Sequence, residues 1–359
     1  MRPIPPFLAL LLALPASAQQ LSWSPQDSNS TAGLRGIDSV DGTIAWASGT
    51  EGTILRTTDA GQHWTRCSTP DAATDGATLD FRGIQAFDAS TAIAMSSGPG
   101  DKSRLYKTTD ACKSWTMLRK NTDKDGFWDA IRLWTPNDGF LAGDPVANHP
   151  FLTEFTGYNG LLVDNVLYAL KANPKGEGAF AASNSGLVLG PFRTKDGESR
   201  EVWFATGGQG GSRVIHYQHF NGGEPERVSV STSEVPFFPM NESSGIFSIS
   251  FDGDRQLIAV GGDYTKPNDP TATSAFSSDG GLHWTASKTP PHGYRSTVQY
   301  SPTLKARNTA GTNGSDISLD DGRTWQPIDN NNWNALSLPF IVGPKGKIAR
   351  LATTPVPRP

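Results

Sequence analysis

The eight residues at 57–64, TTDAGQHW, set a pattern that returns three times along the chain. The copies are TTDACKSW at 108–115, SSDGGLHW at 277–284 and SLDDGRTW at 318–325. Each has a hydroxyl residue at the first position, Asp at the third, Gly at the fifth and Trp at the eighth, except that Cys112 replaces Gly in the second copy. Recurrence of one strict motif indicates an internal repeat architecture.

The chemistry of this motif indicates a turn that satisfies its own polar groups. An Asp in a turn accepts hydrogen bonds from nearby backbone N–H groups, and a Ser or Thr two residues earlier does likewise. Gly permits a positive φ, and Trp contributes a large apolar face. Catalytic acids at equivalent places around a ring would be dispersed. We therefore expect a structural role for Thr57, Asp59, Gly61, Trp64, Thr108, Asp110, Trp115, Ser277, Asp279, Gly281, Trp284, Ser318, Asp320, Gly322 and Trp325.

The spacing of the motif predicts the fold. Asp59 and Asp110 are 51 residues apart, and Asp279 and Asp320 are 41 apart. Repeats of about 40–50 residues with one turn each are typical of propeller blades. A second phrase with an apolar or aromatic first residue marks seven inner strands, at LRGI 34–37, FRGI 81–84, WDAI 128–131, AFAA 179–182, IFSI 246–249, YRST 294–297 and WNAL 333–336. We predict an all-β protein with a single seven-bladed β-propeller of four-stranded blades over residues 19–359.

The two ends of the chain complement each other. GPKGKIAR at 343–350 matches GTEGTILR at 49–56, but the chain ends without a further Trp motif. LSWS at 21–24 resembles the Trp and outer strand that follow each intact turn. We therefore predict that the N-terminal strand completes the last blade, with Trp23 in the place that Trp64 has in the first. Closing the ring in this way removes exposed sheet edges.

The N-terminal residues and the net charge limit the possible location and partners of the protein. Residues 1–18 combine Arg2, an apolar run and Ala16-Ser17-Ala18, which is typical of a secretory signal cleaved near Ala18. We expect export to the periplasm or the extracellular space, without membrane insertion, because no later segment has the roughly 20 apolar residues of a membrane span. The formal charge of −4, without a Lys/Arg run, argues against nucleic-acid binding.

The only two cysteines are Cys67 and Cys112. They are compatible with one disulfide in an oxidising compartment or with two buried thiols, since sequence does not supply the geometry that a bridge requires. Their spacing resembles no metal site, and we expect none.

The four turns resemble the Asp-box, or BNR, repeat of bacterial sialidases, xyloglucanases and sortilin-type receptors. Over residues 21–351 the organisation is more similar to single seven-bladed propellers related to photosystem II assembly factors, which are common among secreted bacterial proteins. That superfamily contains hydrolases, receptors and assembly scaffolds, so the resemblance implies the fold and leaves the function open.

Candidate ligand-binding residues occupy one position of the inner-strand phrase. Arg35, Arg82 and Arg295 share it in units one, two and six, and Asp129 and Asn334 take it in units three and seven. Guanidinium groups suit carboxylates or phosphates, so a peptide carboxylate or an acidic glycan is a candidate ligand. The alternative is that each arginine pairs with a neighbouring acid and only completes a polar channel.

These observations favour an exported, monomeric, non-catalytic binding or assembly scaffold for a protein, peptide or glycan. The alternative is a glycoside hydrolase, either sialidase-like or polysaccharide-cleaving. Tyr264 and Tyr294 lie near the expected channel mouth, but a Tyr beside Arg295 on a strand points the opposite way and suits packing better than nucleophilic attack. No phosphate loop, dinucleotide motif or other cofactor signature occurs, so we expect no cofactor.

Overall fold

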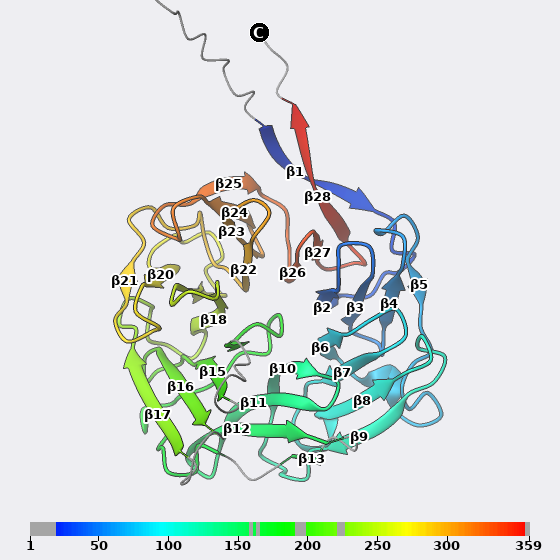
Figure 1. Ribbon diagram of the computed structural model, residues 1–359, viewed down its shortest axis with the longest axis horizontal. Helices are drawn as coiled ribbons and strands as arrows, with labels where there is room; N and C mark the ends of the chain where they lie inside the picture. Colours follow the sequence, from blue (N-terminus) through cyan, green and yellow to red (C-terminus); the bar gives the residue numbers. More distant parts are fainter. Residues whose placement is uncertain (1–18, 158–160, 163–165, 191–198, 221–226, 356–359) are drawn as a thin grey trace, which may run out of the picture.

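Hydrogen-bonded strands divide the chain into seven antiparallel sheets of four strands each, arranged in a ring (Figure 1). The computed structural model describes residues 19–157, 161–162, 166–190, 199–220 and 227–355, so the predicted signal segment 1–18 lies outside the described residues. The predicted all-β, seven-bladed propeller with four-stranded blades is confirmed. Two short 3-10 helices, η1 (Gly76–Thr78) and η2 (Gly100–Lys102), interrupt the strands of the described part.

The first three blades follow the chain from the inner strand outward. They are blade 1 with β2 (Leu34–Ser39), β3 (Ala45–Gly49), β4 (Ile54–Thr57) and β5 (Thr65–Arg66); blade 2 with β6 (Phe81–Ala86), β7 (Ala92–Ser96), β8 (Arg104–Thr108) and β9 (Thr116–Lys120); and blade 3 with β10 (Trp128–Thr135), β11 (Asp138–Val146), β12 (His149–Thr156) and β13 (Leu161–Leu162).

Blades 4 to 6 repeat this order, and blade 7 combines both ends of the chain. They are blade 4 with β14 (Leu187–Leu189), β15 (Ser199–Ala205), β16 (Arg213–Phe220) and β17 (Arg227–Glu234); blade 5 with β18 (Ser244–Phe251), β19 (Leu257–Asp263), β20 (Ser274–Ser277) and β21 (Thr285–Ala286); blade 6 with β22 (Thr297–Ser301), β23 (Ala306–Gly311), β24 (Gly314–Ser318) and β25 (Gln326–Asp329); and blade 7 with β26 (Ala335–Ser337), β27 (Phe340–Val342), β28 (Ile348–Pro355) and β1 (Gln19–Gln26).

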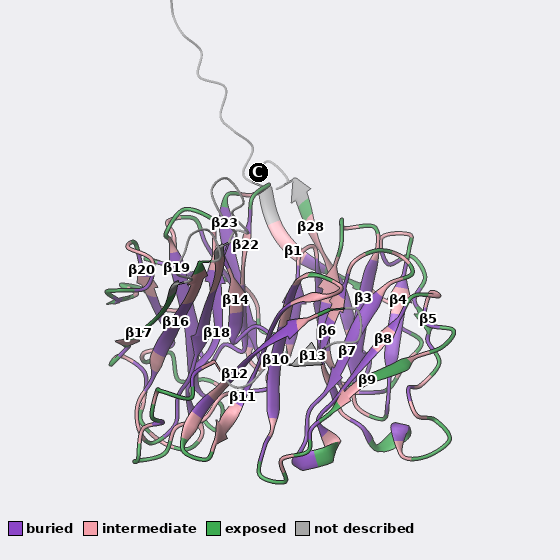
Figure 2. Cartoon of the chain, turned by 60° about the horizontal axis from the view of Figure 1, so that its bottom comes forward, coloured by how far each residue is buried: buried purple, intermediate pink, exposed green. Residues whose placement is uncertain are grey.

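Burial follows the position of a strand within its blade. The second strands β3 and β7 are buried along their whole length, whereas the outer strand β5 is exposed (Figure 2). The outer strand β21 is also exposed. Apolar side chains therefore fill the space between blades, where burial of apolar surface stabilises the ring by roughly 25 cal/mol per Å².

The N-terminal strand closes the ring as the sequence predicts. β1 pairs antiparallel with β28, which places Ser24 opposite Arg350 just as Thr65 lies opposite Arg56 in blade 1 (Figure 1). The residue before each of these pairs is a tryptophan, so Trp23 takes in blade 7 the position of Trp64 in blade 1.

The four Trp motifs form identical closed turns. In the first, Thr57 Oγ1 donates to Asp59 at 2.8 Å and accepts the Gly61 N–H at 3.0 Å, while Asp59 accepts the His63 N–H at 2.9 Å. The other three turns contain the same set of hydrogen bonds. The carboxylates are engaged in holding the turns, in agreement with the structural role that the sequence indicates.

One inner-strand prediction is wrong. The phrase at 179–182 does not start a strand, and the inner strand of blade 4 is instead β14, at Leu187–Leu189. Residues 181–185 cross the central channel: Ser183 Oγ donates to the Ser296 carbonyl of blade 6 at 2.6 Å, and Asn184 Oδ1 accepts the Ile131 N–H of blade 3 at 2.7 Å. We call residues 181–185 the plug, because they join opposite walls of the channel.

Candidate functional site

The inner strands of four blades contain the same irregularity close to their start. The pairing register between first and second strands shifts at Leu34/Gly36, Phe81/Gly83, Trp128/Ala130 and Ile246/Ser248. A β-bulge leaves one residue without a cross-strand partner and redirects its side chain. The residues at the bulges are Arg35, Arg82, Asp129 and Phe247, and all four line a single cavity.

This cavity, the channel-mouth pocket, has a volume of about 440 Å³. Its floor includes Ala181 and Ala182 of the plug, and its walls come from blades 1, 2, 3, 5, 6 and 7. Four of the five predicted ligand-binding residues line it, namely Arg35, Arg82, Asp129 and Asn334. Repetition of one phrase around the ring therefore brings together residues that are far apart in the sequence.

Arg35 is the cation of this pocket that lacks a partner. Within the described residues its guanidinium makes no hydrogen bond or ion pair, and its Nε atom is buried. Burial, and then the charge of Arg82, hold the pKa of Arg35 below its usual value. Asp80 attracts the charge of Arg35 without a direct ion pair. Because an arginine stays charged in proteins, its guanidinium can pair directly with a bound anion.

Arg82 is fixed in place by its neighbours. Its Nε donates to Asp80 at 2.7 Å, its Nη1 donates to the Ala181 carbonyl at 3.3 Å, and the guanidinium lies 6.0 Å from the centre of the Phe127 ring. Arg82 therefore fits the alternative in which an arginine of the channel pairs with a neighbouring acid, because its guanidinium is held between the Asp80 carboxylate and the plug.

Two carboxyl groups of blade 3, Asp129 and Asp144, line the pocket, and Glu242 is a third acid in its lining. Burial, and then repulsion from Asp144, raise the pKa of Asp129 well above its usual range. Its Oδ2 atom is buried without a hydrogen-bond partner among the described residues. Burial also raises the pKa of Asp144, which accepts the Ala179 N–H at 2.9 Å.

An aromatic cluster forms one wall of the pocket. Its members are Phe180, which precedes the plug, and residues of blades 5 and 6. Phe180 stacks on Phe247 with ring centres 3.8 Å apart, and Phe247 makes edge contacts with Tyr264 and Tyr294 at 6.1 and 4.8 Å. Tyr264 is 52% exposed, whereas Tyr294 is buried. Burial raises the pKa of Tyr294 well above its usual value, so a tyrosinate nucleophile is disfavoured there. The wall suits an apolar or aromatic side chain.

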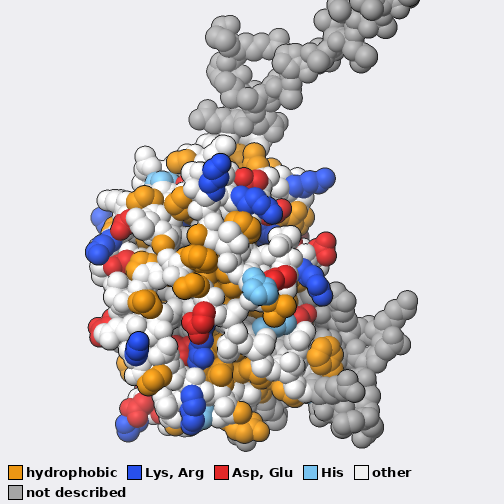
Figure 3. Space-filling view, turned by 90° about the vertical axis from the view of Figure 1, so that its left-hand side faces the viewer, with side chains coloured by type: hydrophobic (Ala, Val, Ile, Leu, Met, Phe, Trp, Pro, Cys, Tyr) orange, Lys and Arg blue, Asp and Glu red, His pale blue; other side chains and the backbone are white. Residues whose placement is uncertain are grey.

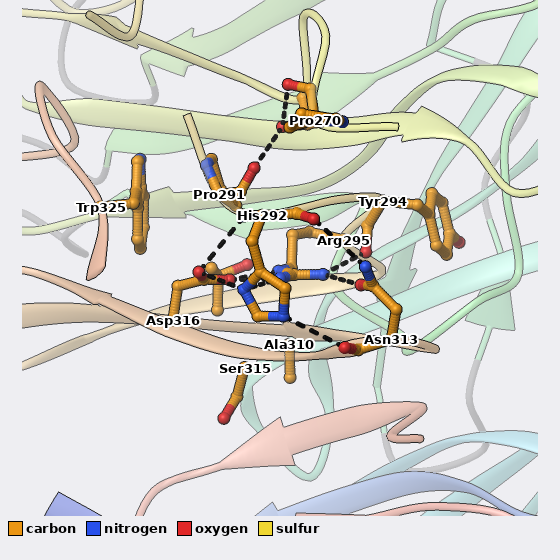
Figure 4. Close-up of polar contacts among 12 residues, drawn as sticks. Pro270, Pro291, His292, Tyr294, Arg295, Ala310, Asn313, Ser315, Asp316 and Trp325 are labelled. Atoms are coloured by element: carbon orange, nitrogen blue, oxygen red, sulfur yellow. Dashed lines mark hydrogen bonds and ion pairs between the residues drawn. The ribbon is translucent and has the colours of Figure 1, made fainter. Parts of the chain in front are cut away.

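Arg295 does not line this pocket, and it follows the alternative in which the arginine pairs with a neighbouring acid. Its side chain is fully buried, its Nε donates to Asp316 at 2.6 Å, and its Nη2 contacts His292 at 2.9 Å (Figure 4). His292 Nδ1 lies 2.6 Å from the same carboxylate. The adjacent Tyr294 ring points away from this cluster, as alternation along an extended segment requires (Figure 4).

The cause is a register difference of one residue. The Arg295 N–H donates to the Gly261 carbonyl of the preceding blade at 3.0 Å, and Leu34 and Trp333 make the equivalent bond to Gly343 and Gly311. Arg295 therefore corresponds to Leu34 rather than to Arg35, and a shift of one residue turns a side chain to the other face. Ser296 takes the pocket position in blade 6.

Sequence reasoning missed several pocket residues. Phe247 was identifiable, because it is the second residue of the phrase IFSI and so occupies the position of Arg35 in LRGI. Phe180 is likewise the second residue of the phrase AFAA, although no strand starts there. Glu242 lies outside every repeated phrase, so no local pattern points to it.

A larger cavity of about 600 Å³ lies between blades 4 and 5. Glu201 and His216 line it and are joined at 2.7 Å, but none of the predicted ligand-binding residues does. The side of the ring that carries β17, β20 and β21 shows charges of both signs among separate apolar patches (Figure 3). Within the described ranges, no group of three or more His, Cys, Asp or Glu side chains is arranged to hold a metal ion.

The structure also joins Cys67 and Cys112 in a disulfide, with Cα atoms 5.3 Å apart. The bridge links the end of the outer strand of blade 1 to the Trp-motif turn of blade 2. Cys112 has a φ of 59°, comparable to the 82° of Gly61, so it keeps the turn conformation that Gly adopts elsewhere.

Fold and site together define a seven-bladed propeller with an arginine- and aromatic-lined pocket at one mouth of a plugged channel. The chain matches no protein-family model. No curated protein matches it either. In the described part of the chain, no helix has the length and apolar character to cross a membrane.

Solved structures share the fold at low sequence identity. YCF48 bound to a D1 peptide is 16% identical with a TM-score of 0.56, over 92% of this chain and 97% of that one. YCF48 from Cyanidioschyzon merolae is 15% identical with a TM-score of 0.56, over 92% and 98%. The WD40 propeller domain of Doa1 is 11% identical with a TM-score of 0.58, over 94% and 98%. These likenesses show the propeller fold.

Proposed function

We propose that this chain is a non-catalytic binding propeller whose channel-mouth pocket holds the terminal carboxylate of a peptide or protein segment. The observation that carries the proposal is the Arg35 guanidinium, which has no direct hydrogen-bond or ion-pair partner among the described residues and lines the same pocket as the aromatic wall. A carboxylate would accept hydrogen bonds from this guanidinium, and an apolar side chain next to it would contact Phe247 and Tyr264.

A peptide fits these groups better than a neutral glycan does, because a neutral ligand would leave the Arg35 guanidinium without a direct ion-pair partner. The volume of about 440 Å³ is suited to a few residues and not to a folded domain. The structurally similar YCF48 has been solved with a D1 peptide, which supports a peptide ligand for a propeller of this kind.

The proposal includes export and membership of the Asp-box repeat group. The composition of residues 1–18 supports export, and the Cys67–Cys112 bridge agrees with an oxidising compartment. The four identical Trp-motif turns support the Asp-box assignment. We propose a monomeric scaffold acting in the periplasm or outside the cell.

The test is an array of short peptides presented with free C-terminal carboxylates and, in parallel, as C-terminal amides. The proposal requires that a subset of acids bind while their amides do not, and that Arg35→Gln abolish this preference. Arg323→Gln is the matched control, because Arg323 lies in an outer turn far from the pocket lining. Equal binding of acids and amides would contradict the proposal.

The alternative function is glycoside hydrolysis, and the one observation in its favour is that Asp129 and Asp144 face the same pocket. Assays on aryl glycosides and polysaccharides test it directly. Turnover that disappears in Asp129→Asn and in Arg35→Ala would establish a hydrolase and overturn the non-catalytic reading.

A further inference from the structure

The channel has a second mouth on the other side of the plug. In blades 1, 3, 5, 6 and 7, residues of the channel-mouth pocket come first along the chain and residues of another cavity follow, as Arg35 precedes Asp38 and Asp129 precedes Arg132. Ser185, at the end of the plug, lines this second cavity, whose volume is about 350 Å³. The two cavities are therefore at opposite ends of the plug.

A ring of hydrogen bonds joins neighbouring blades at this second mouth. The residue three positions after the channel-mouth residue accepts a backbone N–H from the next blade in four of the seven blades. The bonds are Asp38 to Ala86 N–H at 2.7 Å, Gln85 to Leu133 N–H at 3.3 Å, Gln299 to Leu338 N–H at 2.7 Å and Ser337 to Ser39 N–H at 2.9 Å. Acceptor side chains at this position thus have a structural role.

Arg132 occupies the same position in blade 3 and cannot take that role, because a guanidinium has no acceptor. Among the described residues it makes no hydrogen bond or ion pair. The other arginine near this mouth, Arg307, is neutralised by Asp252 at 2.8 Å. Asp38 lines the same cavity and attracts Arg132 without a direct ion pair, and its carboxyl group accepts the Ala86 N–H.

We propose that this second cavity is a binding site for a small organic monocarboxylate, with Arg132 as the anchoring cation. Arg132 is the one guanidinium of this lining, and it has no direct hydrogen-bond or ion-pair partner among the described residues, so it can pair with a single carboxylate better than with a phosphate dianion. Leu187, Ile249, Val298 and Leu336 form the apolar part of the lining and suit an aliphatic or aromatic body. Gln299 engages its Oε1 with Leu338, which leaves its amide N–H₂ group to donate to the ligand.

The site is independent of the peptide-binding proposal, because the plug separates the two cavities and each contains its own arginine. Hexanoate and benzoate are the probes, and hexanamide and benzamide are the uncharged controls, titrated calorimetrically against the full mature chain. We expect the acids to bind and the amides not to bind. Arg132→Gln should weaken acid binding about 30-fold or more, the effect of removing one partner of a buried charge pair.

The titrations are made in the Arg35→Gln background, so that acid binding at the channel-mouth pocket does not contribute. Arg323→Gln is the matched control and should leave the affinity for hexanoate and benzoate unchanged, because Arg323 lines neither cavity. Arg132→Lys keeps the charge and should retain part of the binding, which separates loss of the cation from loss of the fold. Circular dichroism of each variant checks folding. Absence of acid binding in the Arg35→Gln background, equal binding of acids and amides, or full binding by a folded Arg132→Gln variant would each overturn the inference.

Discussion

The indole Nε1 of Trp23 donates a hydrogen bond to Oγ of Ser315 at 2.8 Å, although 292 residues separate the two. Trp325 makes the same bond to Ser274 at 3.1 Å, so each Trp is bonded to a serine of the preceding blade. Trp23 also packs against Trp333, with ring centres 6.3 Å apart. The N-terminal strand therefore contacts the preceding blade in the same way as the Trp-bearing strand of an internal blade does.

Trp23→Ala should therefore destabilise the whole propeller. The lost packing and hydrogen bond should cost about 3–5 kcal/mol, as is typical of large aromatic-to-alanine changes in a core. Trp23→Phe keeps most of the apolar contact and should cost less. The measurement is chemical denaturation, and a change below about 0.5 kcal/mol for Trp23→Ala would contradict closure by the N-terminal strand.

The Arg295–Asp316 pair should matter for stability and not for ligand binding. Removing one member leaves a buried charge, so Arg295→Gln alone should cost about 3–5 kcal/mol. Arg295→Gln combined with Asp316→Asn should cost less than the two single changes added together. Folded Arg295→Gln should bind the array peptides normally. Loss of peptide binding in this folded variant would show that Arg295 belongs to the binding site.

Asp59 and Asp110 should make the propeller sensitive to acid. The His63 N–H, the His63 side chain and Thr57 lower the pKa of Asp59 to about 2, and Ser114 does the same for Asp110. Because these values lie below the usual 3.8, the stabilisation is complete above about pH 4 and is lost as the pH falls through 2. Urea midpoints measured over this range should fall, and Asp59→Asn should reduce the fall. An unchanged pH profile in that variant would contradict the prediction.

Asp38 should show the opposite dependence. Burial raises its pKa from 3.8 to about 6, so the folded state binds a proton that the unfolded chain has released. This contribution therefore favours folding below about pH 4 and is lost as the pH rises through 6. Relative to the natural chain, Asp38→Asn should become progressively more stable between these pH values, by up to about 3 kcal/mol. A constant difference across the range would contradict the raised pKa.

The disulfide should contribute strongly because it closes a long loop. The two cysteines are 45 residues apart, for which chain entropy predicts a loss of about 4 kcal/mol on removal. The Cys67→Ser/Cys112→Ser double variant, compared with the oxidised chain by denaturation, measures this. Equal stability would contradict the entropic estimate.

Features repeated along the sequence could be predicted, and features made by single long-range contacts could not. Trp23 was identifiable because LSWS matches the residues after each intact turn. The bulge residues Arg35, Arg82 and Asp129 share one position of a repeated phrase. The plug at 181–185 could not be predicted, because its contacts with Ile131 and Ser296 leave no signal in the local sequence. The overlapping phrase at 179–182 resembled another inner strand.

Arg295 shows how a correct motif can point to a residue that does not line the pocket. It precedes Asp320 by 25 residues, the distance at which Leu34 precedes Asp59. The other units do not share this count, since Phe81 precedes Asp110 by 29 residues, so distance from the turn alone could not reveal the alignment. The match of YRST to LRGI by arginine alone concealed a shift of one residue, which is enough to reverse the facing of a side chain.

The most direct test of the account is the affinity of one array-selected peptide, measured by calorimetry as free acid and as amide against the natural chain and Arg35→Gln. We predict that the natural chain prefers the acid by about 30-fold or more, and that Arg35→Gln binds both forms equally weakly. An acid preference that survives Arg35→Gln would contradict the claim that this unpaired guanidinium captures a terminal carboxylate.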